Sequence, residues 1–414
     1  MSARDSAHRP VRRLTVYALA ALLLQALALL IWIVRFYVLE DWTAPIVGFD
    51  FAVFWSAARV TMEHGAASVF SQQLMQPLEV ALWHKLHYAP WPYPPTFLLA
   101  VLPFGLLSFG SALVLYSMLG LLSYGSMIAC IVRRAERAWL PVFAASPGVF
   151  VAIALGQNSL FTVGVAGIAL ALIETNSALA GVCVALLVIK PQFGVLIPLV
   201  LICGRQWKVL TVSALCTLAF VGGSTAILGL DVWSAFVTYL PQFNRIAVEY
   251  GGSEMWLGMP TVFAGSRSLG LPVSVAYTVH GLVAAPAVMV TAVLWVKRAR
   301  FALRATAFVA ATLLVQPYIM FYDLAWLILP IAFLVRDAKA APLNRMEWAV
   351  LTAAWLAPAQ GVLAAYVGLY LQIVPAVLVA LLVIVMRRYF ASTAASTQPA
   401  NAVVEHVAGA SRLV

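Results

Sequence analysis

Long apolar runs separated by short polar segments fill almost the whole chain. The first run covers about residues 14–34, which is long enough to cross a membrane, and no small-residue cleavage site follows it. It therefore predicts a retained membrane helix and not a cleaved signal peptide. Four later runs predict further crossings, at about residues 209–229, 273–296, 347–365 and 367–386.

Three pairs of apolar segments each turn at a polar sequence. The turns read LGQNS at 155–159, IKPQF at 189–193 and QPYIMFYD at 316–323. The arms beside the second and third turns have about 12–15 residues, or roughly 18–22 Å of helix, against a hydrocarbon layer of roughly 30 Å. Either these turns stop within the membrane, or the bilayer thins around them. Because non-helical backbone at that depth requires protein or water around it, we expect the three turns to line one cavity.

The segment 94–132 must cross an odd number of times, yet Pro103 and the sequence LSFGS at 107–111 indicate a break into two helices. How two helices in this segment give an odd number of crossings therefore stays open. The chain as a whole predicts an all-α polytopic membrane protein with about 10–12 transmembrane helices. We expect residues 1–390 to form one membrane-embedded domain, followed by a disordered cytoplasmic tail over the Ala/Ser/Thr-rich residues 391–414.

The first long connection, residues 35–94, has a helical pattern of its own. Apolar residues recur there at helical spacing, in two sets: Phe51, Phe54, Trp55, Ala58 and Met62, then Leu74, Leu78, Leu82 and Leu86. These sets predict two amphipathic helices lying along the membrane surface. The aromatic residues near its end, including Tyr93, are of the kind that occupies the headgroup zone.

Composition and charge support a membrane protein and predict its orientation. Of 414 residues, 64% are hydrophobic and 10% are charged, against about 25% charged in a soluble domain. The four cysteines lie in apolar runs without CxxC spacing, which excludes a disulfide framework. The net charge of +10 does not indicate nucleic-acid binding, because most basic residues cluster between apolar runs, as at 297–304. By the positive-inside rule, these clusters and both termini face the cytoplasm, and the acidic connections 35–94 and 230–272 face outward.

The order of motifs along the chain resembles a known family. After the first helix come GFDFAVFWSAARVTMEHGAASVF (48–70), YPPTFLLAVLPFGLLS (93–108), LGQNSLFTVGVAGIALALIE (155–174), ALAGVCVALLVIKPQFGVLIPLVLICGRQWK (178–208) and QPYIMFYDLAWLILPIAFL (316–334). This order is similar to glycosyltransferase family 87, bacterial membrane enzymes related to the mycobacterial polyprenol-phosphate-mannose-dependent mannosyltransferases. The resemblance runs from about residue 14 to 388. It departs from the mycobacterial members at FYDLAW, where they carry histidines and this chain has Tyr322 and Asp323.

The resemblance implies a fold, a reaction and a place in the cell. The fold is the C-type glycosyltransferase fold, with an acidic residue of the first outer loop as catalytic base, and Asp50 is the matching position. The donor is a sugar on a polyprenyl phosphate, here a hexose with mannose as the candidate. The acceptor is a lipid or glycan on the outer face of the bacterial cytoplasmic membrane.

Inverting transfer needs a base for the acceptor hydroxyl and donors or cations for the departing phosphate. Asp50 supplies the carboxylate, and Lys190, with Arg59 or Arg245, supplies positive charge. Candidates for the sugar are amides and tyrosines of the three turns: Gln157, Asn158, Gln192, Tyr318 and Tyr322. Asp323 is expected to be either the partner of Lys190 or a second acid. No acid cluster has metal-ligand spacing, and His84 and His87 are expected to be solvated, so no metal or other cofactor is predicted.

Several alternatives stay open at this point. Asp50 is also a favoured residue for capping the helix that follows it, and Glu40 and Asp41 are competing acids. The alternative for Lys190 is a side chain that extends from a helix end toward water. The alternative for Gln157 and Asn158 is hydrogen bonding to backbone groups of their turn. The competing function is a transporter or flippase of a lipid-linked saccharide, because broken helices with polar groups at the midplane are typical of carriers.

Overall fold

The computed structural model describes residues 3–82, 88–132, 134–361 and 372–397. The chain is 82% helical, and the described residues contain no strand. Within the described ranges, six helical segments are long and apolar enough to cross a membrane, and five shorter apolar helices accompany them. The prediction of an all-α polytopic membrane protein is therefore confirmed.

The long apolar segments correspond to helices α1 (Ala3–Ile33) with η1 (Val34–Val38), α5 (Phe109–Ile131), η4 (Arg134–Trp139) with α6 (Leu140–Ala144) and α7 (Pro147–Leu155), α11 (Trp207–Leu228), α15 (Val273–Val296) and α20 (Val374–Thr397). The shorter apolar helices are α4 (Pro95–Val101) with η3 (Leu102–Leu106), α8 (Ser159–Leu172), α9 (Ser177–Ala185) with η5 (Leu186–Ile189), η6 (Pro191–Gly194) with α10 (Ile197–Cys203), and α16 (Phe301–Val315). The break predicted within 94–132 is present, because η3 ends at Leu106 and Ser108 caps the start of α5.

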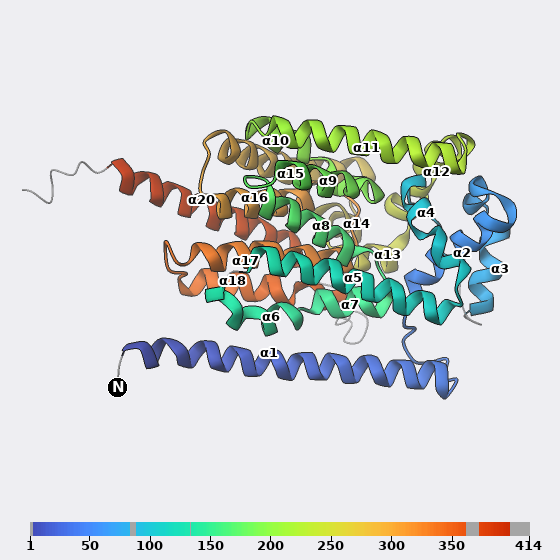
Figure 1. Cartoon of the computed structure of the whole chain (residues 1–414), viewed down its shortest axis with the longest axis horizontal. Coiled ribbons are helices and arrows are strands. Elements are labelled where there is room, and N and C mark those ends of the chain that lie inside the picture. The colour runs from blue at the N-terminus through green and yellow to red at the C-terminus, as the bar shows by residue number, and fades with distance from the viewer. Residues whose placement is uncertain (1–2, 83–87, 133, 362–371, 398–414) are drawn as a thin grey trace, which may run out of the picture.

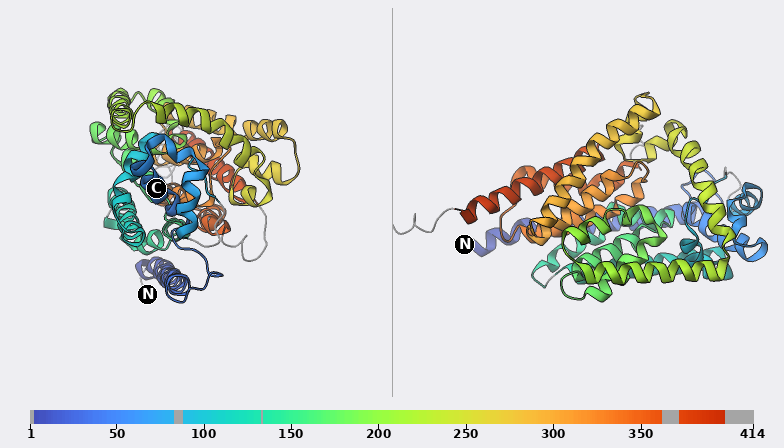
Figure 2. Two further views of the ribbon diagram at one scale, coloured as in Figure 1. Left: turned by 90° about the vertical axis from the view of Figure 1, so that its right-hand side faces the viewer. Right: turned by 90° about the horizontal axis from the view of Figure 1, so that it is seen from above.

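The centre of the bundle is α16 with η8 (Phe321–Leu327) and α17 (Ile328–Asp337). Every residue of α16 from Leu303 to Leu314 is buried, because this mainly apolar helix packs against α15, α17 and α20 (Figure 2). By contrast, α1 lies apart along one side of the bundle (Figure 1), and only 6% of its apolar stretch is buried inside the protein. Its exposed apolar surface suits contact with lipid.

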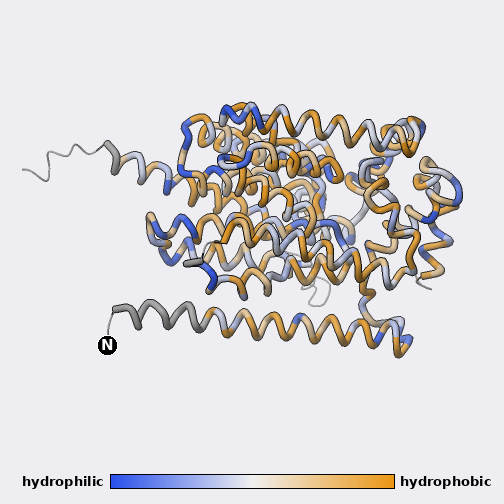
Figure 3. Tube along the Cα trace, in the orientation of Figure 1, coloured by the Kyte–Doolittle hydropathy of each residue, from blue (hydrophilic) through white to orange (hydrophobic). Residues whose placement is uncertain are grey.

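The two long connections lie together at one end of the molecule, opposite the N-terminus and the end of α20 (Figure 1). The first contains α2 (Phe49–His64), η2 (Ala66–Phe70) and α3 (Gln72–Leu82). The second contains α12 (Asp231–Phe243), η7 (Asn244–Glu249), α13 (Gly252–Gly258) and α14 (Val262–Ser268). Figure 3 shows that the helices are mainly hydrophobic and that polar residues gather at the helix ends and at turns inside the bundle.

Two expectations about these regions need correction. The pattern predicted an amphipathic helix along the membrane surface, but α2 is buried on most sides, at Phe51–Phe54, Ser56–Ala58 and Val60. It packs against η2, η3 and α3, so it is part of the core of the loop end. The predicted tail began at residue 391, whereas α20 continues as a helix to Thr397. The Ala/Ser/Thr composition of that segment permits helix, since Ala is the strongest helix former.

The described residues between α17 and α20 also include α18 (Arg345–Leu356) and η9 (Ala357–Ala359). Asn344 begins α18 by accepting a hydrogen bond from the Glu347 amide, and the Glu347 carboxylate accepts one from the Asn344 amide. This reciprocal cap fixes the helix start. The predicted crossing at 347–365 overlaps α18 and η9, and its last residues, 362–365, lie outside the described residues.

Candidate active site

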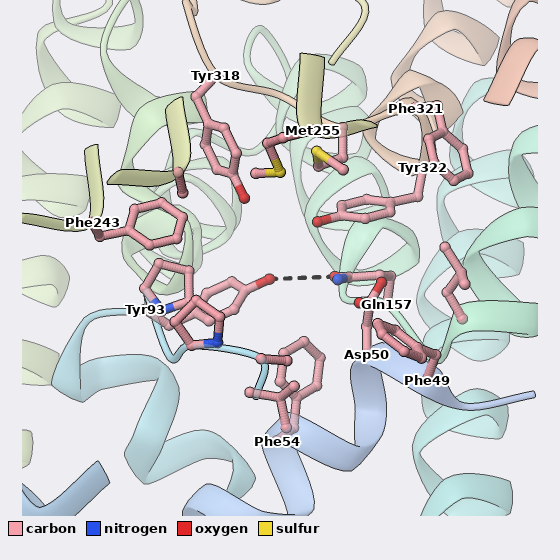
Figure 4. Close-up of a pocket in the computed structure, with 17 residues that line it drawn as sticks. Phe49, Asp50, Phe54, Tyr93, Gln157, Phe243, Met255, Tyr318, Phe321 and Tyr322 are labelled. Carbon is pink, nitrogen blue, oxygen red and sulfur yellow. Dashed lines mark hydrogen bonds between the residues drawn. The ribbon is translucent and has the colours of Figure 1, made fainter. Parts of the chain in front are cut away.

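The candidate site is a cavity of about 400 Å³ at the loop end of the bundle, here called the Asp50 pocket. Its walls come from the start of α2, the segment 89–93, the α7–α8 turn, the second long connection and the turn before η8 (Figure 4). Four residues predicted for the site line it, namely Asp50, Gln157, Tyr318 and Tyr322. Most of the other lining side chains are aromatic or aliphatic, including Phe54, Phe243 and Met255.

Two glycines bring Asp50 to the α7–α8 turn. Gly48 has φ +83° at the N-cap of α2, and Gly156 has φ +68° at the end of α7, so both need the left-handed conformation that glycine adopts freely. A Cβ on Gly156 would lie 2.5 Å from Cβ of Phe51, and one on Gly48 would lie 2.7 Å from the Leu113 side chain. The Gly48 amide donates to the carbonyl of Ala154 at 2.7 Å. The start of α2 is therefore held directly against this turn.

This geometry decides the capping alternative for Asp50. Gly48 is the N-cap of α2, and no side-chain hydrogen bond caps the helix. Asp50 is the second residue inside the helix and its side chain lines the pocket. The expectation that Asp50 merely caps α2 is therefore wrong.

The Asp50 carboxyl has an unusual electrostatic environment. Enclosure by protein raises its pKa from 3.8 to about 6, although a hydrogen bond from the Gln157 side chain and the nearby Lys190 charge lower the pKa in part. No ion pair joins Asp50 to a basic side chain among the described residues. A carboxyl with a pKa near 6 is unprotonated at neutral pH yet binds a proton readily, which suits a general base.

Gln157 is oriented by hydrogen bonds to its carbonyl oxygen. Its Oε1 accepts from the Asn158 backbone amide at 3.2 Å and from the Tyr93 hydroxyl at 3.5 Å (Figure 4). Because the oxygen already accepts these bonds, the amide nitrogen is the atom that donates the hydrogen bond to Asp50. The side chain is 4% exposed, so this geometry is shielded from bulk water. Gln157 therefore lies beside the carboxylate and lines the pocket, and its predicted contact with sugar stays a prediction.

Behind the pocket wall lies a buried ion pair. The Lys190 Nζ is 2.6 Å from Oδ1 of Asp323, and the two residues are 3% and 1% exposed. Lys190 also donates to Asn158 Oδ1 at 3.2 Å, and the Ser159 hydroxyl donates to Asp323 at 3.1 Å. These bonds join the three polar turns, which confirms that the turns converge. Of the two roles predicted for Asp323, the structure shows the partner of Lys190.

Other predicted residues lie outside the pocket. Arg59 pairs with Glu63 at 2.7 Å on an exposed face of α2. The carbonyl of Gln192 accepts from Gln316 Nε2 at 2.7 Å, and Gln192 does not line the cavity. Lys190 and Asn158 touch the pocket only through Tyr322 and Gln157, since the Lys190 Nζ lies 5.1 Å from the Tyr322 ring centre. The competing acids Glu40 and Asp41 do not line it either.

The hydrogen bonds of Asp41 make it a weaker candidate for the base than Asp50. The Thr43 hydroxyl and amide and the Arg35 guanidinium lower its pKa to about 2. A carboxylate held this strongly in the ionised form is a poor proton acceptor. Among the described residues, no group of three or more His, Cys, Asp and Glu side chains is arranged to hold a metal ion. His84 and His87 lie outside the described residues.

Sequence reasoning missed Tyr93 and most of the aromatic wall. Tyr93 was interpreted as a headgroup-zone aromatic, but it is 8% exposed and its ring packs 5.2 Å from that of Phe54. The available signal was PWPYPP at 90–95, since a proline-rich segment inside an apolar region holds a side chain in one fixed backbone path. That path places Tyr93 beside Gln157.

Comparison with known proteins gives one match. The model of glycosyltransferase family 87 matches residues 91–317, which is more than half of the chain. No curated protein and no solved structure matches. The matched region contains Tyr93, Gln157 and Lys190, while Asp50, Tyr318 and Tyr322 lie outside it. The chain belongs to glycosyltransferase family 87 and is a membrane glycosyltransferase.

Proposed function

We propose that the protein transfers a hexose from a polyprenyl-phosphate donor to a lipid or glycan acceptor, by a single inverting displacement with Asp50 as base. The observation that carries this proposal is Asp50 itself: a carboxyl that forms no ion pair with the described residues, with a pKa of about 6, in an otherwise largely apolar pocket. An apolar pocket at the end of membrane helices suits a substrate that arrives in the bilayer.

In the proposed step, the acceptor hydroxyl loses its proton to Asp50 as its oxygen attacks the anomeric carbon. The new carbon–oxygen bond forms on one face of the sugar while the bond to the phosphate oxygen breaks on the other, which inverts the configuration. Polyprenyl phosphate departs with the bonding electron pair. General-base assistance of this kind contributes about 10²–10⁴-fold.

The leaving phosphate gains negative charge, so hydrogen-bond donors near it stabilise the transition state. Among the described residues no Lys or Arg lines the pocket. The side chains there that can donate are the hydroxyls of Tyr93, Tyr318 and Tyr322 and the amide of Gln157. We assign the phosphate to Tyr318 and Tyr322, which face the pocket from the side opposite Asp50 (Figure 4). Gln157 orients the carboxylate.

We assign Lys190 and Asp323 a positioning role, in place of the phosphate contact expected for Lys190. Their charges already satisfy each other at 2.6 Å, and Tyr322 lies between Lys190 and the cavity. The pair fixes Asn158 beside Gln157 and holds the residue next to Tyr322. It thereby sets the distance between the two sides of the pocket.

The proposed location is the bacterial cytoplasmic membrane, with both termini in the cytoplasm and the Asp50 pocket facing outward. The basic clusters support this orientation, because residues 297–304 cover the connection between α15 and α16 and the start of α16, away from the pocket. A Cys introduced at Lys297, in a chain whose four native cysteines are replaced, tests it. We expect no labelling by a membrane-impermeant thiol reagent in intact cells, and labelling there would invert the topology.

The reaction itself is tested with purified protein in nanodiscs. Undecaprenyl phosphates bearing radiolabelled mannose, glucose or galactose are supplied together with envelope lipid extract as acceptor. We expect label to move from one of these donors to an acceptor. A protein that carries the labelled donor across proteoliposome membranes without any transfer would instead be the flippase of the alternative interpretation.

A further inference from the structure

A second apolar cavity of about 400 Å³ lies next to the Asp50 pocket, between the outer end of α1 and α7. We name it the α1–α7 groove. It is lined by α1 at Trp32, by α7 at Phe150 and Ala154, and by the segment before α2 at Ile46, and none of its described lining residues carries a charge. The rings of Trp32 and Phe150 lie 5.4 Å apart and join the two helices. Both helices belong to apolar segments long enough to cross a membrane.

The groove adjoins the Asp50 pocket. Phe49, Leu155 and Phe321 line both cavities. Each of the three lies within two residues of a pocket side chain that bears chemistry, namely Asp50, Gln157 and Tyr322. Two other apolar cavities along α1, one with Leu121 and Gly125 and one with Tyr17 and Trp355, share no lining residue with the pocket.

We propose that the α1–α7 groove holds the isoprenoid chain of the donor lipid. This inference rests on the proposed function, which requires a polyprenyl-phosphate sugar. In such a donor, one phosphate group separates the anomeric carbon from the first isoprene unit. Hydrocarbon must therefore begin close to the reacting atoms, and it must lead from there to the membrane interior. Among the cavities described above, the groove meets both requirements, because it shares three lining residues with the pocket and runs beside the lipid-exposed α1.

The groove suits the donor better than the acceptor. The hydroxyl of an acceptor need not be near its lipid part, so an acceptor can enter from the outer side. The Asp50 pocket has such a side, formed by Pro90 and Pro92 of the first connection and by Phe243 and Ala247 of the second. Occupation of the groove by the acceptor chain, or by a bilayer lipid, is therefore an outcome that the experiment must separate.

The first test uses wild-type protein in nanodiscs and undecaprenyl phosphate that carries a diazirine on the isoprene unit next to the phosphate. We expect photolabelling at Trp32, Phe150 and neighbouring groove residues, and competition by unlabelled undecaprenyl phosphate. Labelling confined to the cavity at Leu121 and Gly125, or labelling that an acceptor lipid extract removes while undecaprenyl phosphate does not, would overturn the assignment.

The second test fills the groove from two walls, with Ile46→Trp and Ala154→Phe. The matched control is Ala129→Phe, an exposed position in the larger apolar cavity of about 810 Å³ that does not reach the pocket. We expect undecaprenyl phosphate to bind either groove variant at least about tenfold more weakly, which corresponds to exclusion of about two methylene groups from an apolar site. Geranyl phosphate, whose short chain occupies only the start of the groove, should lose less affinity in the variants than undecaprenyl phosphate does. Melting temperatures exclude unfolding as the cause.

Failure of this inference differs from failure of the proposed function. If the wild type transfers sugar from an undecaprenyl donor and the groove variants do so with unchanged KM, the groove is not the chain site although the function holds. If the wild type transfers no sugar from any polyprenyl-phosphate donor and does not bind undecaprenyl phosphate more tightly than geranyl phosphate, both fail. Raised KM for the long donor in both variants, with unchanged KM in Ala129→Phe, supports the groove.

Discussion

Asp50 and Asp323 are two carboxyls of the same site with opposite surroundings. Asp323 is 1% exposed and is fully engaged, by the Lys190 ammonium, the Ser159 hydroxyl and the Met320 amide. Asp50 faces the cavity, has no basic partner among the described residues, and is served by the neutral Gln157 side chain. Sequence alone does not distinguish them, since both are isolated acids in apolar segments.

The comparison shows that the surroundings of a carboxyl determine whether it stabilises the structure or transfers a proton. A carboxylate whose lone pairs are occupied by a cation and two donors holds structure together and cannot accept a proton without breaking those bonds. A carboxyl that is poorly solvated but unpaired has a raised pKa and is ready for proton transfer. We therefore expect changes at Asp323 and its partners to act first on stability, and changes at Asp50 and its partners to act first on rate.

The largest effect is expected from removing the partner of Asp323. Lys190→Met leaves a buried carboxylate unpaired, which typically lowers the free energy of unfolding by about 3–5 kcal/mol. The double variant Lys190→Met/Asp323→Asn removes the stranded charge and should recover much of this loss. Thermal melting in detergent of the two single variants and the double variant measures the coupling.

The exposed pair Arg59–Glu63 supplies the control for that experiment. Its side chains are 42% and 44% exposed, so Arg59→Met should cost only about 0.3–0.5 kcal/mol. A Lys190→Met protein that melts like the wild type but no longer binds undecaprenyl phosphate would show that Lys190 serves the donor and not Asp323.

The next effect concerns the hydrogen bond that orients Asp50. Gln157→Leu removes a donor to a carboxylate, and such bonds contribute about 1.5–3 kcal/mol, so kcat/KM at neutral pH should fall about 10–100-fold. Because this bond lowers the pKa of Asp50, its loss should also move the acid limb of the pH–rate profile to higher pH. Gln192→Leu, at a turn glutamine outside the pocket, is the matched control and should leave both quantities unchanged.

The pH dependence of the wild type sharpens the comparison further. With the pKa of Asp50 at about 6, kcat/KM should be level above that pH and fall about tenfold per pH unit below it. Stability should change in the opposite sense. Between pH of about 4 and 6 the folded carboxyl keeps a proton that the unfolded one has lost, so the contribution of Asp50 to stability falls as the pH rises through this window. A flat rate profile from pH 5 to 8 would contradict the base assignment.

The smallest effect is expected at Tyr93. Its hydroxyl donates to Gln157 over 3.5 Å, a long bond, so Tyr93→Phe should cost about 0.5–1.5 kcal/mol of transition-state stabilisation. The ring stays packed on Phe54, and the melting temperature should be preserved. A loss of activity as large as that of Gln157→Leu would mean that the hydroxyl contacts the substrate directly.

Sequence patterns predicted the parts of this molecule that depend on local chemistry. Short arms and polar turns predicted that the turns of Asn158, Lys190 and Asp323 converge, because polar groups at membrane depth need polar partners. The break near Pro103 was also predicted correctly, since proline and the following Ser108 cap act locally. The resemblance to family 87 is confirmed by the match over residues 91–317.

What could not be predicted depends on the path of the chain between elements. The burial of α2 follows from its packing against η2, η3 and α3, and a helical repeat of apolar residues does not reveal how many faces are covered. Tyr93 reaches Gln157 only because the segment 88–94 runs back over α2. Arg59 was placed near the phosphate by charge alone, but its position along α2 turns it outward toward Glu63.

The most direct test of the division between the two carboxyls compares Asp50→Asn with Asp323→Asn in one preparation, by initial rate of sugar transfer per folded molecule and by melting temperature. We expect Asp50→Asn to melt like the wild type and to lose about 10²–10⁴-fold in rate, because an amide cannot take the proton. We expect Asp323→Asn to melt at a lower temperature and to keep most of its rate per folded molecule. Turnover at the wild-type rate in Asp50→Asn would contradict the account.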